Sequence, residues 1–127
     1  MKNDYLSELI IGESIKIHKA LGPGLLENVY ETILYHELSK AGLSIQRQVP
    51  IPVSYEGVIM EIGFRADLIV ENEIIIEIKF IEDILPVHAK IMLTYLKLSG
   101  KHVGLIINFR KELLKSGIKR IVHDWTG

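Results

Sequence analysis

The stretch from Arg65 to Lys79, RADLIVENEIIIEIK, carries the strongest fold signal in the chain. Two apolar runs, residues 66–70 and 74–80, flank a short polar turn at residues 71–73, which predicts two strands of a hairpin. Three consecutive isoleucines begin the second run, as expected for a strand that is buried on both faces. This hairpin therefore belongs at the centre of a sheet.

The segments on either side predict the rest of the order. Apolar spacing indicates helices over residues 5–20 and 25–41, separated by the Gly22-Pro23-Gly24 break. Strands are expected at 44–55 and 58–64, then a helix over 86–99 that Gly100 ends, then strands at 101–108 and 118–123. A strand on each side of a helix implies a crossover. The predicted fold is α/β: two N-terminal helices, four strands, a helix and two strands, in a mixed β-sheet flanked by α-helices.

Composition limits the class of protein. With 127 residues, 48% hydrophobic and 24% charged, the chain is expected to form one globular domain over residues 1–127. The absence of cysteine excludes a disulfide framework, a thiolate zinc site and a cysteine nucleophile. Acidic residues interrupt the N-terminal segment, and no apolar run approaches the roughly 20 residues of a membrane span. We therefore expect a cytoplasmic protein that does not enter the membrane.

Three charged residues interrupt the central hairpin: Asp67 in the first strand, and Glu77 and Lys79 in the second. Residues two apart on a strand point to one face, so Glu77 and Lys79 lie together. A short hairpin can bring Asp67 beside Glu77, and a hard divalent cation relieves the repulsion of two carboxylates. Lys79 could then orient or deprotonate a metal-bound water. In the alternative interpretation, Asp67 lies at the end of a strand next to a turn, and Glu77 and Lys79 form the solvent-facing side of an ordinary amphipathic strand.

Two helices carry weaker candidates. Glu27 and Tyr30 share one face of the second helix, where Glu27 could equally be an acid stabilised by the helix macrodipole. His88 begins the third helix, where an imidazole could meet a phosphate or cap the helix. Tyr95 lies on the same helix at a spacing that suits packing on the sheet.

Taken together and in this order, the motifs resemble those of the GxxExxY family of the PD-(D/E)XK nuclease-like superfamily. The resemblance covers about residues 11–122 and rests on Gly24-x-x-Glu27-x-x-Tyr30, Asp67, Glu77-x-Lys79, Thr94-Tyr95-Leu96-Lys97 and the strand at 104–109. It implies a restriction-endonuclease-like core. One position departs from the pattern, because Ile91 stands where relatives of the phage exonuclease and helicase-nuclease type carry Gln.

The resemblance also implies roles for individual residues. Asp67, Glu77 and the carbonyl of Ile78 match the ligands of Mg²⁺ (or Mn²⁺), and Lys79 matches the lysine that positions the attacking water. Glu27 matches a helical glutamate that binds the metal or its water shell. The candidates for contact with substrate are Tyr30, His88, Tyr95 and Lys97.

Three functions follow as hypotheses. The first is a Mg²⁺- or Mn²⁺-dependent nuclease that acts on DNA, with Asp67, Glu77, Lys79 and Glu27 as catalytic residues. The second is a non-catalytic nucleic-acid-binding or regulatory module on the same scaffold. The third is a small α/β protein whose central charges form a structural ion network and which binds a protein partner. A homodimer is also expected, because so small a domain needs a second subunit to surround a duplex.

Charge is distributed unevenly along the chain. The formal net charge is −1, but residues 1–83 hold seven basic and fourteen acidic side chains, whereas residues 84–127 hold eight basic and two acidic ones. The basic half predicts a phosphate-facing surface, with solvated lysines as the alternative. Its members would be Lys97, Lys101, Arg110, Lys111, Lys115, Lys119 and Arg120.

Overall fold

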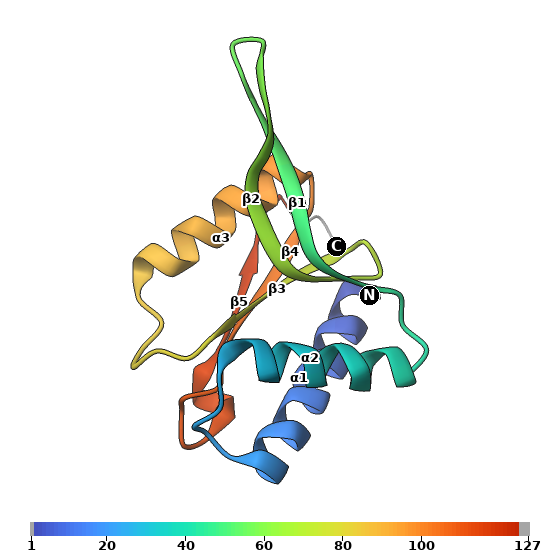
Figure 1. Ribbon diagram of the computed structural model, residues 1–127, viewed down its shortest axis with the longest axis vertical. Coiled ribbons are helices and arrows are strands. Elements are labelled where there is room, and N and C mark those ends of the chain that lie inside the picture. The colour runs from blue at the N-terminus through green and yellow to red at the C-terminus, as the bar shows by residue number, and fades with distance from the viewer. Residues whose placement is uncertain (1, 125–127) are drawn as a thin grey trace.

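A computed structural model describes residues 2–124 as three α-helices and a five-stranded sheet (Figure 1). The strands lie in the order β1-β2-β3-β4-β5; β3 and β4 are parallel and the other neighbours are antiparallel. The elements are α1 (Lys2–Leu21), α2 (Glu27–Lys40), β1 (Ile45–Tyr55), β2 (Val58–Val70), β3 (Ile74–Lys79), α3 (Pro86–Ser99), β4 (Val103–Asn108), the 3₁₀ helix η1 (Leu114–Gly117) and β5 (Ile118–Val122).

This arrangement confirms the predicted mixed α/β fold and corrects one part of it. Residues 58–64 and 66–70 form a single strand, β2, so three strands precede α3 instead of four. The predicted break at Arg65 is absent because its charged side chain is exposed and its backbone pairs with Pro50 of β1. None of the helices within residues 2–124 is long and apolar enough to cross a lipid bilayer.

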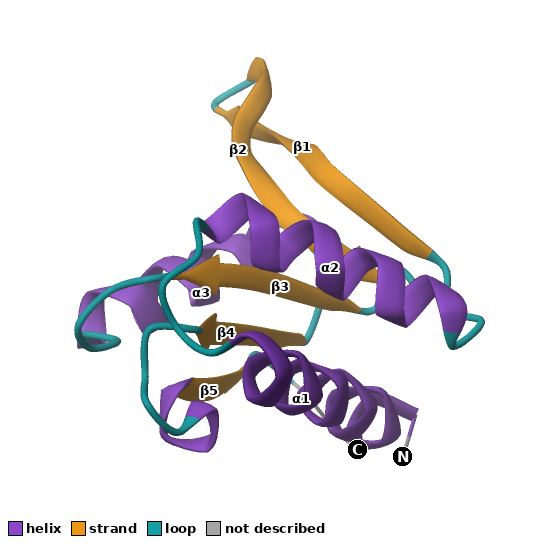
Figure 2. Ribbon diagram, turned by 60° about the horizontal axis from the view of Figure 1, so that its bottom comes forward, coloured by secondary structure: helices purple, strands orange, loops and turns teal. Residues whose placement is uncertain are grey.

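Helices cover both faces of the sheet, with α1 and α2 on one side and α3 on the other (Figure 2). Side chains of β3 point alternately to the two faces of the sheet, so this strand contributes to the core on each face. Ile74, Ile76 and Ile78 pack in the α1/α2 core, whereas Ile75 packs with Met92 and Leu96 of α3. Because side chains alternate along a strand, residues 77 and 79 face α3 as well. The two charged positions of β3 therefore belong to the α3 side of the sheet.

The β1–β2 hairpin changes faces part of the way along. Ile45 and Leu68 belong with the α1/α2 core, but Ile51 and Ala66 pack with the α3 core. The switch falls at Gln48, whose φ of 48° puts a non-glycine residue in the left-handed region inside a strand. Register places Gln48 opposite Asp67, so both strands invert their alternation at this point.

Beyond this point the hairpin leaves the sheet as a two-stranded arm (Figure 1). The strands β2 and β3 share three residue pairs, Leu68↔Ile76, Ile69↔Ile75 and Val70↔Ile74, while β1 and β2 continue together to the Tyr55↔Val58 pair. The strands β2 and β3 thus separate at Asp67.

Candidate active site

Asp67 and Glu77 lie where β2 and β3 part. Their backbones are opposite each other, one residue past the last paired residues, Leu68 and Ile76. The Asp67 carboxylate takes the place of a backbone acceptor, because the N–H of Ile78 donates to its Oδ2 at 2.8 Å. The N–H of Asp67 in turn donates to Oε1 of Glu77 at 3.5 Å. The structure therefore brings the two predicted carboxylates side by side.

Electrostatically, this pair is poorly compensated. Glu77 is 9% exposed. Its burial, and after that the negative charge of Asp67, raises the pKa of Glu77 to about 8, although the Lys79 ammonium acts in the opposite direction. Within residues 2–124, neither carboxylate forms an ion pair with a Lys, Arg or His side chain within 4.0 Å. An acidic pair with one buried member and no basic partner in this range favours either a proton or a cation.

The backbone of Ile78 adds an oxygen to the same edge. In a strand, the N–H and C=O of one residue face the same neighbour. The N–H of Ile78 faces Asp67, whereas the carbonyl of Lys79 accepts from Phe109 on the opposite side of β3. The Ile78 carbonyl therefore points into the gap that β2 leaves. Two carboxylates and a carbonyl are the hard oxygen donors that Mg²⁺ and Mn²⁺ take, so the donor set fits such an ion.

Glu27 does not join this pair. It is the first residue of α2, its side chain is exposed, and its Oε2 accepts the N–H of Phe80 at 3.0 Å. Within residues 2–124, no three His, Cys, Asp or Glu side chains come close enough to hold one metal ion. Glu27 is therefore held one residue beyond Lys79, at the end of β3.

Tyr30 is a correction to the sequence prediction. Its side chain is 0% exposed, so substrate cannot reach it. The ring stacks on Phe109 with centroids 4.3 Å apart, and the hydroxyl donates to the carbonyl of Gly22 at 2.6 Å and accepts the N–H of Leu25. Tyr30 therefore anchors the Gly22–Leu25 loop against the core and sets where α2, with Glu27, begins.

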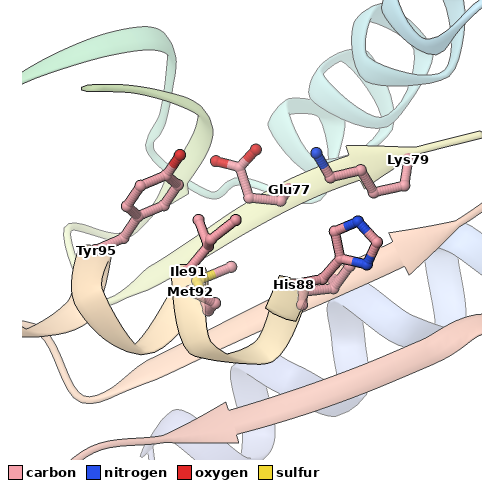
Figure 3. A pocket seen from close by; sticks show the side chains of 7 residues that line it. Glu77, Lys79, His88, Ile91, Met92 and Tyr95 are labelled. Atoms are coloured by element: carbon pink, nitrogen blue, oxygen red, sulfur yellow. The ribbon is translucent and has the colours of Figure 1, made fainter. Parts of the chain in front are cut away.

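A cavity lies between β3 and α3 next to the carboxylate pair (Figure 3). Tyr95 stacks on Phe64 of β2 with centroids 3.9 Å apart, and its burial, with the charges of Glu77 and Asp67, raises the pKa of the Tyr95 hydroxyl. Ile91, the residue that departs from the motif pattern of the sequence analysis, is 43% exposed. The lining residues are Glu77, Lys79, His88, Ile91, Met92, Tyr95 and Ile106.

Several basic residues of the C-terminal half are held by partners in other parts of the fold. Lys97 is exposed on α3 and is absent from the residues that line the cavity. Lys101 donates to the carbonyl of Asn72, Lys111 pairs with Asp83, and Arg120 pairs with Asp4 of α1. Three of the seven predicted phosphate contacts thus have partners of their own within the chain.

Sequence reasoning missed a polar cluster that supports Asp67. The amide of Gln48 donates to Oε1 of Glu31 at 2.8 Å and to Oδ1 of Asp67 at 3.4 Å. Arg47 forms an ion pair of 3.1 Å with the other oxygen of Glu31. The available signal was the helical spacing of Glu31 with Glu27, which placed an acid on the face of α2 that proves to be buried.

A five-stranded mixed sheet between helices, with Asp, Glu-x-Lys and a carbonyl at a fork of two strands, defines a restriction-endonuclease-like protein. The chain belongs to the PD-(D/E)XK nuclease superfamily, whose family model matches residues 4–121. None of the curated proteins matches this chain. A solved structure titled "Crystal structure of SSO0001" is 18% identical over 94% of this chain and 79% of that one, with a TM-score of 0.49.

Proposed function

We propose that this protein is a divalent-metal-dependent nuclease that hydrolyses phosphodiester bonds of DNA at the Asp67–Glu77–Lys79 site. The observation that carries the proposal is the meeting of Asp67 and Glu77 at the strand fork, with the N–H of Ile78 bound to Asp67. Membership of the nuclease superfamily supports the reaction type. The spacing Gly24-x-x-Glu27-x-x-Tyr30 supports a place in the GxxExxY family.

Each residue of the site has a role that follows from its position. Asp67, Glu77 and the Ile78 carbonyl would hold Mg²⁺ or Mn²⁺, which in such sites polarises the phosphate and lowers the pKa of a coordinated water. Lys79 follows on the same face of β3, where its ammonium offsets negative charge that develops on the phosphate. Glu27, whose Oε2 accepts the Phe80 amide, would contact water around the ion and not the ion itself.

Three finer features of this function remain predictions. DNA is the preferred substrate, the protein acts as a homodimer because one small domain cannot surround a duplex, and it works in the cytoplasm. Light scattering of the purified protein at micromolar concentration tests the dimer, and a monomer there contradicts it.

The nuclease proposal is tested by incubating supercoiled and linear DNA with the protein in Mg²⁺, in Mn²⁺ and in EDTA. Asp67→Asn and Lys79→Met each remove one group of the site, and cleavage should fall by about 100-fold or more for each. Glu61→Gln is the matched control, because it neutralises an exposed carboxylate on the same strand as Asp67. Its rate should equal that of the wild type.

Equal cleavage by the wild type, Asp67→Asn and Lys79→Met contradicts the proposal, because the activity then arises elsewhere. Cleavage that persists in EDTA contradicts the metal dependence. DNA binding without any cleavage, and with the same affinity in Asp67→Asn, supports instead the non-catalytic nucleic-acid-binding module.

A further inference from the structure

The helix α3 faces the carboxylate pair with few polar groups. His88, Ile91, Met92 and Tyr95 line the cavity, and their spacing of three or four residues puts them on one face of the helix. Ile91 and Met92 are apolar, and Tyr95 stacks flat on Phe64. His88 is therefore the nitrogen donor that the described part of α3 presents to this cavity.

A hydrogen bond from Leu85 fixes the ring of His88. The N–H of Leu85 donates to Nδ1 of His88 at 2.8 Å, and the backbone N–H of His88 donates to the carbonyl of Leu85 at 2.9 Å, which holds the two backbones together. A backbone N–H can only donate, so Nδ1 must accept with its lone pair. The proton of the neutral ring therefore lies on Nε2. The heavy atoms alone decide the tautomer here.

The other nitrogen of the ring is turned toward the site. Figure 3 shows His88 beside Lys79, with one ring nitrogen on the side of strand β3. Because Nδ1 is held by Leu85, that nitrogen is Nε2, and it carries the N–H. A neutral donor in this position attracts an anion without repelling the ammonium of Lys79.

We propose that His88 is a phosphate-contacting residue, whose Nε2–H donates to a non-bridging oxygen of a phosphodiester bound beside Asp67, Glu77 and Lys79. The inference rests on the proposed nuclease function and deepens it, because it names a contact to the substrate. His88 binds and orients the phosphate, and it transfers no proton.

Two substitutions of equal size separate the donor from the cap. His88→Gln keeps an oxygen that can accept from Leu85 and also provides an N–H that can reach the phosphate. His88→Glu keeps the accepting oxygen, as glutamate does in a capping box, but provides no donor. His36→Glu makes the same charge change at an exposed histidine of α2 and serves as the control.

The readouts are the affinity for a fluorescein-labelled DNA duplex in Ca²⁺ and the cleavage rate in Mg²⁺. We expect His88→Glu to lose about tenfold or more in affinity, because the hydrogen bond to the phosphate is absent and the new carboxylate repels the phosphate, while His88→Gln stays within about threefold of the wild type. His36→Glu should match the wild type. If His88→Glu binds as well as the wild type, or if His88→Gln falls as far as His88→Glu, the inference is wrong.

This order of affinities also separates the two proposals. Affinities in the expected order without cleavage by any variant overturn the nuclease function and leave the phosphate contact standing. Cleavage by the wild type with unchanged affinity in His88→Glu overturns the contact alone. A two-bond ¹⁵N–¹H spectrum of the imidazole adds a direct check, because a ring protonated on Nδ1 contradicts the inference.

Discussion

Glu31 and Glu77 are both buried carboxylates, 4% and 9% exposed, but their surroundings differ. Both oxygens of Glu31 are bound, one by Arg47 and the other by the amide of Gln48. Arg47 also lies over the ring of Tyr35, 5.3 Å from its centroid, which fixes the guanidinium. Glu77 instead has a second carboxylate, Asp67, as its nearest charged neighbour across the strands.

The difference separates a structural acid from a functional one. A buried charge is tolerated when it is paired and hydrogen-bonded, as Glu31 is. Glu77 lacks such a pair within residues 2–124, and the protein bears that cost at a strand fork where three oxygen donors meet. Gln48 connects the structural acid to the candidate site, because its side-chain amide donates to both Glu31 and Asp67.

The largest expected effect concerns the charge of Glu77 in metal-free protein. Because its pKa rises from 4.5 to about 8 on folding, protonated Glu77 favours the folded state. That contribution is complete below about pH 4.5 and is lost as the pH rises through about 8. Glu77→Gln carries no charge, so above about pH 8 it should exceed the wild type in unfolding free energy, by about 5 kcal/mol at most.

Urea denaturation in EDTA at a series of pH values measures this difference. The advantage of Glu77→Gln should shrink steadily toward pH 4.5, whereas Glu61→Gln, at an exposed position of β2, should show no such trend. A difference between wild type and Glu77→Gln that does not change with pH would show that Glu77 is already compensated.

The second effect comes from removing the partner of Glu31. Arg47→Met leaves the buried Glu31 carboxylate with a single hydrogen bond within residues 2–124, from the Gln48 amide, so the unfolding free energy should fall by about 2–3 kcal/mol. Lys40→Met removes an exposed helix pair with Glu37 and should change it by about 0.5 kcal/mol or less. Thermal or urea unfolding compares the two. An equal loss of unfolding free energy in both variants would show that Glu31 needs its ion pair no more than a surface carboxylate does.

The smallest effect tests the backbone of Gln48. In an ordinary strand, glycine is less stable than alanine, but a left-handed φ of 48° reverses that order. Gln48→Gly should therefore be more stable than Gln48→Ala by about 1 kcal/mol. At Gln46, an exposed residue of the same strand without a positive φ, alanine should be the more stable replacement. The same order at both positions would contradict a strained backbone at Gln48.

The central hairpin could be predicted because its sequence fixes its register. A three-residue turn between Val70 and Ile74 pairs these two residues, and counting back places Asp67 opposite Glu77. Isoleucines throughout the first part of β3 made a solvated face improbable, and the strand is buried as expected. Local rules also predicted the helix over 86–99 and its end at Gly100. The structure confirms both, and Gly100 has the left-handed φ of 71° that is typical of such an end.

Other features left no pattern in the sequence. A left-handed glutamine inside a strand has no residue signature, so the change of faces at Gln48 could not be foreseen. The helical period placed Tyr30 and Glu27 on one face but could not tell a core position from a site position. The two apolar runs at 58–64 and 66–70 predicted two strands, but Arg65 between them pairs with Pro50, and its exposed side chain needs no break in β2.

The most direct test is to titrate Mn²⁺ into the wild type, Glu77→Gln and Glu61→Gln, the exposed control on β2, by isothermal calorimetry. If the Asp67–Glu77 pair holds a cation, the wild type and Glu61→Gln bind Mn²⁺ saturably with similar affinity, and Glu77→Gln loses this binding. If all three bind Mn²⁺ equally, or if the wild type does not bind it, the pair is not a metal site.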